Sequence, residues 1–226
     1  MKIGILLSGC GVYDGAEIQE AVFSMLAIEE MGAEVLAIGV NADQHHVVNH
    51  LTGEEMPETR NMLVEAARIA RGAIKDIKDI QPADMDALVI PGGFGSAKNL
   101  SKWAFEGPDG AILPEVKLLL VNMINIGKPI VALCVSPVLV AKALEDVKLE
   151  PSLTIGSTES ASPYDIQGFQ AGIAKTGATI INKAKDEIQI DEAHKIITAP
   201  CYMMETDLPT LRKNIYDAIN AIKTLV

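Results

Sequence analysis

Residues 129–137 read Pro-Ile-Val-Ala-Leu-Cys-Val-Ser-Pro, an apolar run that meets a helix-start signal at a cysteine. A short, nearly all-apolar segment is typical of a strand buried on both faces of a parallel sheet. Ser136 and Pro137 place a capping hydroxyl before a proline at the first helical position, and Ser162 and Pro163 do the same before a later helix. The segment therefore predicts a strand that turns sharply into a helix, with Cys134 at the elbow.

The same alternation extends over most of the chain. Apolar, β-branched runs also lie at 3–7, 35–40, 87–90, 153–155, 179–181 and 196–199. Helical patterns occur at 16–31, 58–71, 114–126, 137–144, 163–176 and 209–225, and the alternation over 186–197 indicates a hairpin. This order predicts a mostly parallel, flavodoxin-like sheet between two helical layers, a three-layer α/β/α fold. We expect a single domain over residues 1–226.

Composition and charge exclude several classes of partner. The 30 acidic residues outnumber the 19 basic ones, so a phosphate backbone or an anionic membrane is disfavoured. Apolar runs are too short to span a bilayer. The three cysteines lack metal-ligand spacing and are odd in number, which favours free thiols in a reducing compartment. We expect a cytoplasmic protein, or one of an organelle matrix, that binds neither nucleic acid nor membrane.

Three loops carry residues suited to chemistry. Cys134 would project beyond the carboxyl edge of the sheet, where a helix N-terminus favours its thiolate, although many free cysteines simply fill a core. Gly92 and Gly93 follow the strand at 87–90 and could bring backbone N–H groups to a ligand. Glu17 opens the first helix near the same edge and could relay a proton. The long loop 41–58 holds three of the four histidines.

These loops, together with other segments, resemble one protein family. The segments that carry the resemblance are Leu6-Leu-Ser-Gly-Cys-Gly-Val-Tyr-Asp-Gly-Ala-Glu-Ile18, Asn49-His-Leu-Thr-Gly-Glu54, residues 58–72, Val89-Ile-Pro-Gly-Gly-Phe-Gly-Ser-Ala-Lys-Asn-Leu-Ser101 and Thr198-Ala-Pro-Cys-Tyr-Met203. Together they resemble the ElbB branch of the ThiJ/PfpI superfamily, whose domain is class I glutamine amidotransferase-like. The resemblance implies a link to isoprenoid biosynthesis, a weak glutathione-independent glyoxalase activity and a homodimer.

Site residues follow from the resemblance position by position. Cys134 matches the elbow nucleophile, Glu17 the acid that contacts it, and Gly92, Gly93 and the amide of Val135 the oxyanion hole. Substrate-orienting positions are His50, Arg60, Lys98 and Asn99. Many superfamily members carry a histidine close after the cysteine, whereas Val135-Ser136-Pro137 follow here. Because that histidine is missing, glutaminase activity is not expected.

Two functions from different classes remain open. The first is a lyase without cofactor or metal that converts glyoxal or methylglyoxal to the 2-hydroxy acid through a hemithioacetal of Cys134. The second is a redox-sensing or interaction protein in which Cys134 is oxidised. A nucleotide-dependent dehydrogenase is disfavoured, because the glycines of residues 9–15 lack the dinucleotide-binding spacing.

Overall fold

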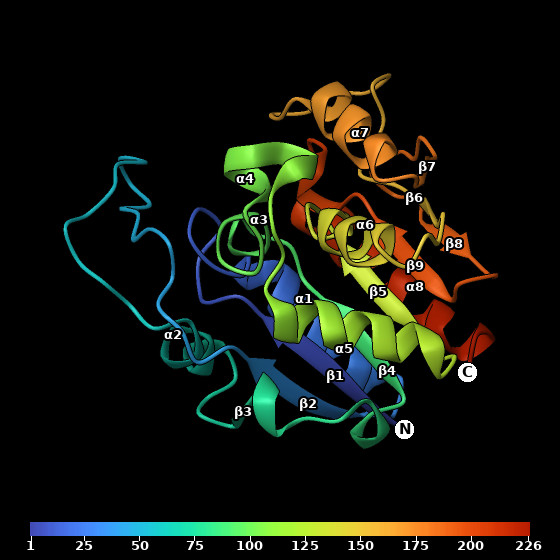
Figure 1. Cartoon of the computed structure of the whole chain (residues 1–226), viewed down its shortest axis with the longest axis horizontal. Helices are drawn as coiled ribbons and strands as arrows, with labels where there is room; N and C mark the ends of the chain where they lie inside the picture. Colours follow the sequence, from blue (N-terminus) through green and yellow to red (C-terminus); the bar gives the residue numbers. More distant parts are fainter.

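A seven-stranded sheet forms the middle layer of the computed structural model, which describes all 226 residues (Figure 1). Its strands run in the order β3-β2-β1-β4-β5-β9-β8. In chain order they are β1 (Lys2–Leu7), β2 (Glu34–Gly39), β3 (Ile74–Asp76), β4 (Ala87–Ile90), β5 (Ile130–Leu133), β8 (Gln189–Asp191) and β9 (Ile196–Ala199). All neighbouring strands pair in parallel except β8 and β9. The predicted mostly parallel sheet and its hairpin are confirmed.

Helices cover both faces of this sheet. Helices α1 (Ile18–Glu30) and α8 (Leu208–Asn220) lie on one face, whereas α5 (Pro114–Asn125) and α6 (Pro137–Glu145) lie on the other (Figure 1). The remaining helices are α2 (Met62–Ile69), α3 (Gly95–Lys98), α4 (Trp103–Glu106) and α7 (Ile166–Lys175). Short 3-10 helices occupy Ile77–Asp79, Pro82–Asp84, Gly107–Asp109, Cys201–Met203 and Ala221–Thr224. The predicted three-layer α/β/α fold is confirmed.

The central strands are apolar because the sheet is covered on both sides. Every residue of β4, β5 and β9 is buried, as a sheet between two helical layers requires. Their carboxyl ends all reach one edge, so the loops that follow β1, β4 and β5 lie together there.

Two of the predicted strands do not join the sheet. Strands β6 (Ser152–Leu153) and β7 (Thr179–Ile180) pair only with each other, and they lie with α7 outside the main layers (Figure 1). The apolar runs at 153–155 and 179–181 were thus correctly predicted to contain strands, but these strands were wrongly assigned to the main sheet.

At three helix N-termini, the start or the cap differs from the prediction. The Ser136 hydroxyl does not cap α6 and donates instead to the carbonyl of Pro91, 2.6 Å away. Helix α7 is capped by Asp165 rather than by Ser162, because the Asp165 carboxylate accepts from the Gly168 amide. Helix α2 begins only after its cap Asn61, so the predicted helix at 58–71 was too long at both ends.

The segment between β2 and α2 has neither helices nor strands and projects from the body of the molecule (Figure 1). Two polar side chains of the body hold it. Asp14 Oδ2 accepts from the Val48 amide at 2.7 Å, and Asn99 Oδ1 accepts from the His45 amide at 2.8 Å. This loop is therefore attached to the same edge of the sheet as the loops after β1 and β4.

The homodimer stays a prediction. Helix α1 exposes Ile18, Val22 and Leu26 at a spacing of four residues, which places them on one side of the helix. None of the helices is both long and apolar enough to cross a bilayer.

Helix α5 offers a matched test of the packed layers. Leu120 is fully buried, whereas Leu118 on the same helix is 62% exposed. We expect Leu120→Ala to lower the free energy of unfolding by about 2 to 5 kcal/mol, because it removes apolar contacts and leaves a cavity. Urea denaturation measures this loss, and Leu118→Ala serves as the control. Equal losses in both variants would contradict the packing of α5 described above.

Candidate active site

The site forms where the order of the strands reverses. The chain runs outward from β1 to β2 on one side and from β4 to β5 on the other, and such a switch point opens a crevice at the carboxyl edge of a sheet. The loops after β1 and β4 bind each other there. The Glu17 amide donates to the Gly92 carbonyl, and the Gly95 amide donates to the Gly15 carbonyl, both at 2.9 Å. The floor of the crevice is thus formed by two loops whose backbones are hydrogen-bonded to each other.

Cys134 occupies the elbow after β5. Its φ of 56° lies in the left-handed region, which a residue other than glycine adopts only when its surroundings hold it there. The Cys134 amide donates to the Ala199 carbonyl of β9 at 2.9 Å, and the Ser136 hydroxyl ties the next turn to the loop after β4. The predicted elbow is therefore present, with Cys134 at the carboxyl edge of the sheet.

Glu20 supplies the carboxyl group that contacts this thiol. Its side chain is fully buried and is hydrogen-bonded to the Cys134 thiol. One carboxyl oxygen accepts from the Gly92 amide at 2.8 Å and the other from the Tyr202 amide at 3.3 Å. Glu20 thus connects the loops after β4, β5 and β9.

The prediction that Glu17 contacts Cys134 was wrong in its position. Helix α1 begins at Ile18, and Glu17 is its N-cap, with Oε2 accepting from the Glu20 amide at 2.6 Å. One helical turn separates the two carboxyl groups, so the residue that turns inward to the thiol is Glu20. The sequence around residue 17 did not indicate that Glu20 is the residue in contact with the thiol, because the residue at which the helix begins decides which carboxyl group faces the sheet.

Two backbone amides point at the sulfur of Cys134. They belong to Gly93 and Val135, two of the three predicted oxyanion-hole positions, whose role as an oxyanion hole stays a prediction. The third predicted donor, the amide of Gly92, is bound to Glu20 instead. Gly92 still has a steric role, since a Cβ at this position would lie 2.8 Å from the Cys134 sulfur.

The thiol is protonated at neutral pH, contrary to the thiolate expected from the helix N-terminus. Burial raises the pKa of Cys134 well above its ordinary value, and the negative charge of Glu20 raises it further; the amides of Gly93 and Val135 oppose this only in part. Burial and the nearby Glu17 likewise raise the pKa of Glu20 to about 8. A buried, protonated thiol reacts slowly with peroxide and with aldehydes alike unless a neighbouring group takes its proton.

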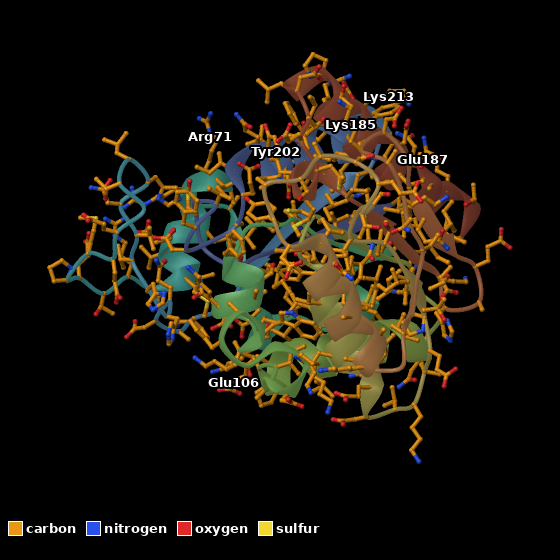
Figure 2. All side chains as sticks on the ribbon, turned by 90° about the horizontal axis from the view of Figure 1, so that it is seen from above. Arg71, Glu106, Lys185, Glu187, Tyr202 and Lys213 are labelled. Carbon is orange, nitrogen blue, oxygen red and sulfur yellow. The ribbon has the colours of Figure 1, made fainter.

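Aromatic side chains enclose the thiol. Phe94, Tyr164 and Tyr202 line a small pocket beside Cys134 that holds about 10 Å³ of free space. Burial and the neighbouring Cys134 raise the pKa of Tyr164 to about 12, so its hydroxyl stays a donor. Figure 2 shows Tyr202 over the central part of the molecule, whereas Glu106 at the end of α4 lies at its margin. The space can hold about one water molecule.

A larger cleft of about 390 Å³ opens on the solvent side of this pocket. The two spaces share Val12, Tyr164 and Tyr202 as walls, and Glu17 lines the outer one. Glu20, Tyr164 and Tyr202 were missed as site residues. Tyr202 lies in the segment 198–203 that carries the family resemblance, which was a usable signal; Tyr164 is brought in only by the folding of the segment before α7.

The four predicted substrate-orienting residues do not reach the thiol pocket. Asn99 is buried, and its Nδ2 donates to the carbonyls of Ser8 and Asp14. Lys98 donates to the Tyr13 carbonyl at 2.8 Å. Each therefore fixes the loop after β1 through its backbone.

His50 and Arg60 belong to the projecting segment. His50 Nε2 accepts from the Tyr13 amide at 3.3 Å, and the imidazole lies 3.9 Å from the Asp14 carboxylate. Arg60 pairs with Glu58 at 2.9 Å. None of their contacts involves Cys134, so His50 does not take the place of the missing histidine in this structure.

Residues 10–146 match the DJ-1/PfpI family, and this stretch includes the elbow, the acid and both glycines of the site. The chain belongs to the DJ-1/PfpI family. The segments on which the resemblance was based thus identified the superfamily correctly.

Two relatives extend the similarity over the whole chain. The human protein named Glutamine amidotransferase-like class 1 domain-containing protein 3, mitochondrial, is 39% identical over 223 residues, covering 98% of this chain and 80% of its own. A crystal structure from Ehrlichia chaffeensis, described as an isoprenoid biosynthesis protein with amidotransferase-like domain, is 34% identical with a TM-score of 0.89 over 100% of both chains.

A more distant structure shares the fold alone. Glyoxalase III from Candida albicans is 16% identical with a TM-score of 0.60, covering 98% of this chain and 97% of its own. The fold is thus shared by proteins of different activity, and activity has to be inferred from the site.

The raised pKa of Glu20 predicts how stability depends on pH. Between its ordinary pKa of 4.5 and about 8, folded Glu20 keeps a proton that the unfolded chain has lost. Its contribution to stability is therefore complete at low pH and is lost as pH rises through this window. We expect Glu20→Gln to remove this loss, which is on the order of 5 kcal/mol for a pKa raised from 4.5 to about 8, at about 1.4 kcal/mol per pKa unit.

Urea denaturation between about pH 4.5 and 8 measures the effect. At low pH the Glu20→Gln variant is the less stable one, because the glutamine can accept only one of the two amide bonds. The exposed Glu106→Gln serves as control and should follow the wild type. Parallel pH profiles for wild type and Glu20→Gln would contradict the assignment.

Asn99 is predicted to act through stability rather than through substrate. Asn99→Ala removes the donor for two carbonyls and the acceptor for the His45 amide, so we expect a loss of about 3 kcal/mol in the free energy of unfolding. Lys98→Ala removes one exposed bond and should cost about 1 kcal/mol or less. A stable Asn99→Ala variant with impaired substrate binding would restore the substrate-orienting role.

Proposed function

We propose that this protein is a cofactor-independent lyase of the glyoxalase type, which converts glyoxal or methylglyoxal to glycolate or lactate. The proposal rests chiefly on one contact, the hydrogen bond between the buried Glu20 carboxyl group and the Cys134 thiol. A nucleophile and a proton carrier with a pKa of about 8 are the two groups that this reaction needs near neutral pH.

The first step joins the thiol to the aldehyde. The sulfur of Cys134 attacks the carbonyl carbon, the carbonyl electron pair moves to oxygen, and the thiol proton reaches that oxygen through Glu20. The product is a hemithioacetal. The Gly93 and Val135 amides, which point at the sulfur, lie where they can stabilise negative charge on sulfur or on the adjacent oxygen.

The second step moves hydrogen between adjacent carbons. The Glu20 carboxylate removes the proton from the carbon that carries sulfur and delivers it to the neighbouring carbonyl oxygen, so that an enediol forms. Transfer of the hydroxyl proton of the sulfur-bearing carbon to the neighbouring carbon then gives a thioester of a 2-hydroxy acid. One carbon is oxidised by two electrons and the other reduced by two, so no external oxidant is consumed. Water then breaks the carbon–sulfur bond, releases the acid and restores the thiol.

The dimensions of the site favour small substrates. The space beside Cys134 is only about 10 Å³, so the reactive carbon must enter from the outer cleft of about 390 Å³, past Tyr164 and Tyr202. Glu17 and Gln19 line that outer cleft and can accept or donate hydrogen bonds to a hydrated aldehyde. With Phe94 in the position described here, a carbonyl compound of two or three carbons meets this restriction.

Other observations support the proposal without identifying the substrate. The family contains glyoxalase III enzymes, as the Candida albicans structure illustrates, although that likeness extends to the fold only. The Ehrlichia chaffeensis relative is described as an isoprenoid biosynthesis protein, and we propose the same link here. Three unpaired cysteines suit a reducing compartment, such as the cytoplasm or the matrix of the organelle named for the human relative.

Turnover of glyoxal to glycolate tests the proposal with matched variants. We expect Cys134→Ala to abolish product formation, and Glu20→Gln to lower kcat by about 100-fold or more, because proton transfer is lost. Glu17→Gln should change kcat by less than about tenfold, since Glu17 does not contact the thiol. Chromatographic measurement of glycolate reports all three.

Two results would overturn the proposal. One is an absence of turnover by the wild-type protein, and the other is equal turnover by wild type and Cys134→Ala. If Glu17→Gln loses as much activity as Glu20→Gln, the proposed reaction still stands, but the proton-transfer role is assigned to Glu17.

A further inference from the structure

Aromatic side chains gather at one cleft that the proposed reaction does not use. The chain has only four phenylalanines and one tryptophan. Three of these phenylalanines, Phe94, Phe105 and Phe169, line a cleft of about 350 Å³ together with the single tryptophan, Trp103. Helices α4 and α7 form its two sides. Trp103 also belongs to the hydrophobic core, against which Phe169 packs. Because so many of the few large aromatic side chains of this chain surround open space, we interpret the cleft as a ligand site.

Phe94 connects this cleft to the thiol. It lines both the cleft and the small pocket beside Cys134. It also follows Gly93, whose amide points at the sulfur, and its ring packs edge-on against Tyr164 with 5.5 Å between the ring centroids. Rotation of the Phe94 ring would therefore join the two spaces. The cleft is placed to receive the distal part of a molecule whose reactive end lies at Cys134.

The lining specifies the chemistry of that distal part. Asp165 is the only charged residue in the cleft, so a negatively charged group is disfavoured there. On the α7 side the wall is kept flat by Gly172, where a Cβ would come within 3.0 Å of the Trp103 ring. Flat apolar walls with aromatic faces suit a planar or slender neutral group.

We propose that this cleft binds the neutral aryl or alkyl group of a larger 2-oxoaldehyde whose carbonyl end reacts with Cys134. The assignment rests on the proposed function and names its substrate class: substituted 2-oxoaldehydes in addition to glyoxal itself. In this arrangement the Phe94 ring separates the cleft that binds the distal group from the pocket in which Cys134 reacts, and its rotation connects the two spaces.

The single tryptophan allows binding to be measured without turnover. Benzyl alcohol, a neutral aryl compound that does not react with thiols, should give a saturable change in Trp103 fluorescence in the whole protein. Ala104 is exposed and lines the cleft, so Ala104→Phe fills the cleft from its rim and should abolish the change. Ala111→Phe introduces the same ring at an exposed position outside the cleft and should leave the change intact.

Substrate selectivity then links the cleft to the reaction. We expect Ala104→Phe to lower the ratio of kcat/KM for phenylglyoxal to that for glyoxal by about tenfold, the usual effect of losing one apolar subsite. Ala111→Phe should keep the wild-type ratio. Circular dichroism confirms that both variants are folded.

The possible failures are distinguishable. A non-saturable or unchanged Trp103 signal, or a selectivity ratio that Ala104→Phe leaves at the wild-type value, overturns the assignment of the cleft while glyoxal turnover stands. If wild type turns over neither glyoxal nor phenylglyoxal, the proposed function fails and with it the substrate role of the cleft. The Trp103 titration then decides separately whether the cleft binds neutral aryl compounds at all.

Discussion

The contact between the Glu20 carboxyl group and the Cys134 thiol is the constraint on which the site depends. Two ionisable groups are fully or almost fully buried side by side, and they stay together because backbone amides of Gly92, Tyr202, Gly93 and Val135 satisfy them. Burial disfavours the charged form of both groups, so the pair holds its protons at neutral pH. Such a pair is suited to pass a proton to a bound molecule rather than to sit permanently ionised.

The rest of the carboxyl edge is organised to keep this contact in place. The loop after β1 is joined to the loop after β4 by backbone hydrogen bonds, and Asn99 and Asp14 tie the projecting segment to both. The strained backbone of Cys134 is held by β9 through the Ala199 carbonyl. Polar residues that the sequence predicted to orient the substrate thus stabilise the loops of this edge instead. The path to the thiol passes between aromatic side chains, chiefly those of Phe94, Tyr164 and Tyr202.

Fold and site differ in how far the sequence could predict them. Apolar runs such as 129–133 and the glycines at 92 and 93 indicated the parallel sheet, the elbow and two of the three loops, because these patterns depend on neighbours along the chain. They could not place the strands near 153 and 180 in a separate sheet, since strand pairing is decided by distant partners. Capping by Asp165 instead of Ser162 is a similar case, in which two local signals competed a few residues apart.

The sequence by itself determined the fold class, the family and the identity of Cys134 as the elbow residue, because periodicity, glycine positions and motifs are local properties. Only the tertiary structure decided that Glu20 rather than Glu17 reaches the thiol, that the thiol is protonated, and that Phe94 stands between two cavities. Each of these depends on where a helix begins relative to the sheet, or on how completely side chains from five separate segments of the chain exclude water. Neither quantity can be calculated from residues that are adjacent in the chain.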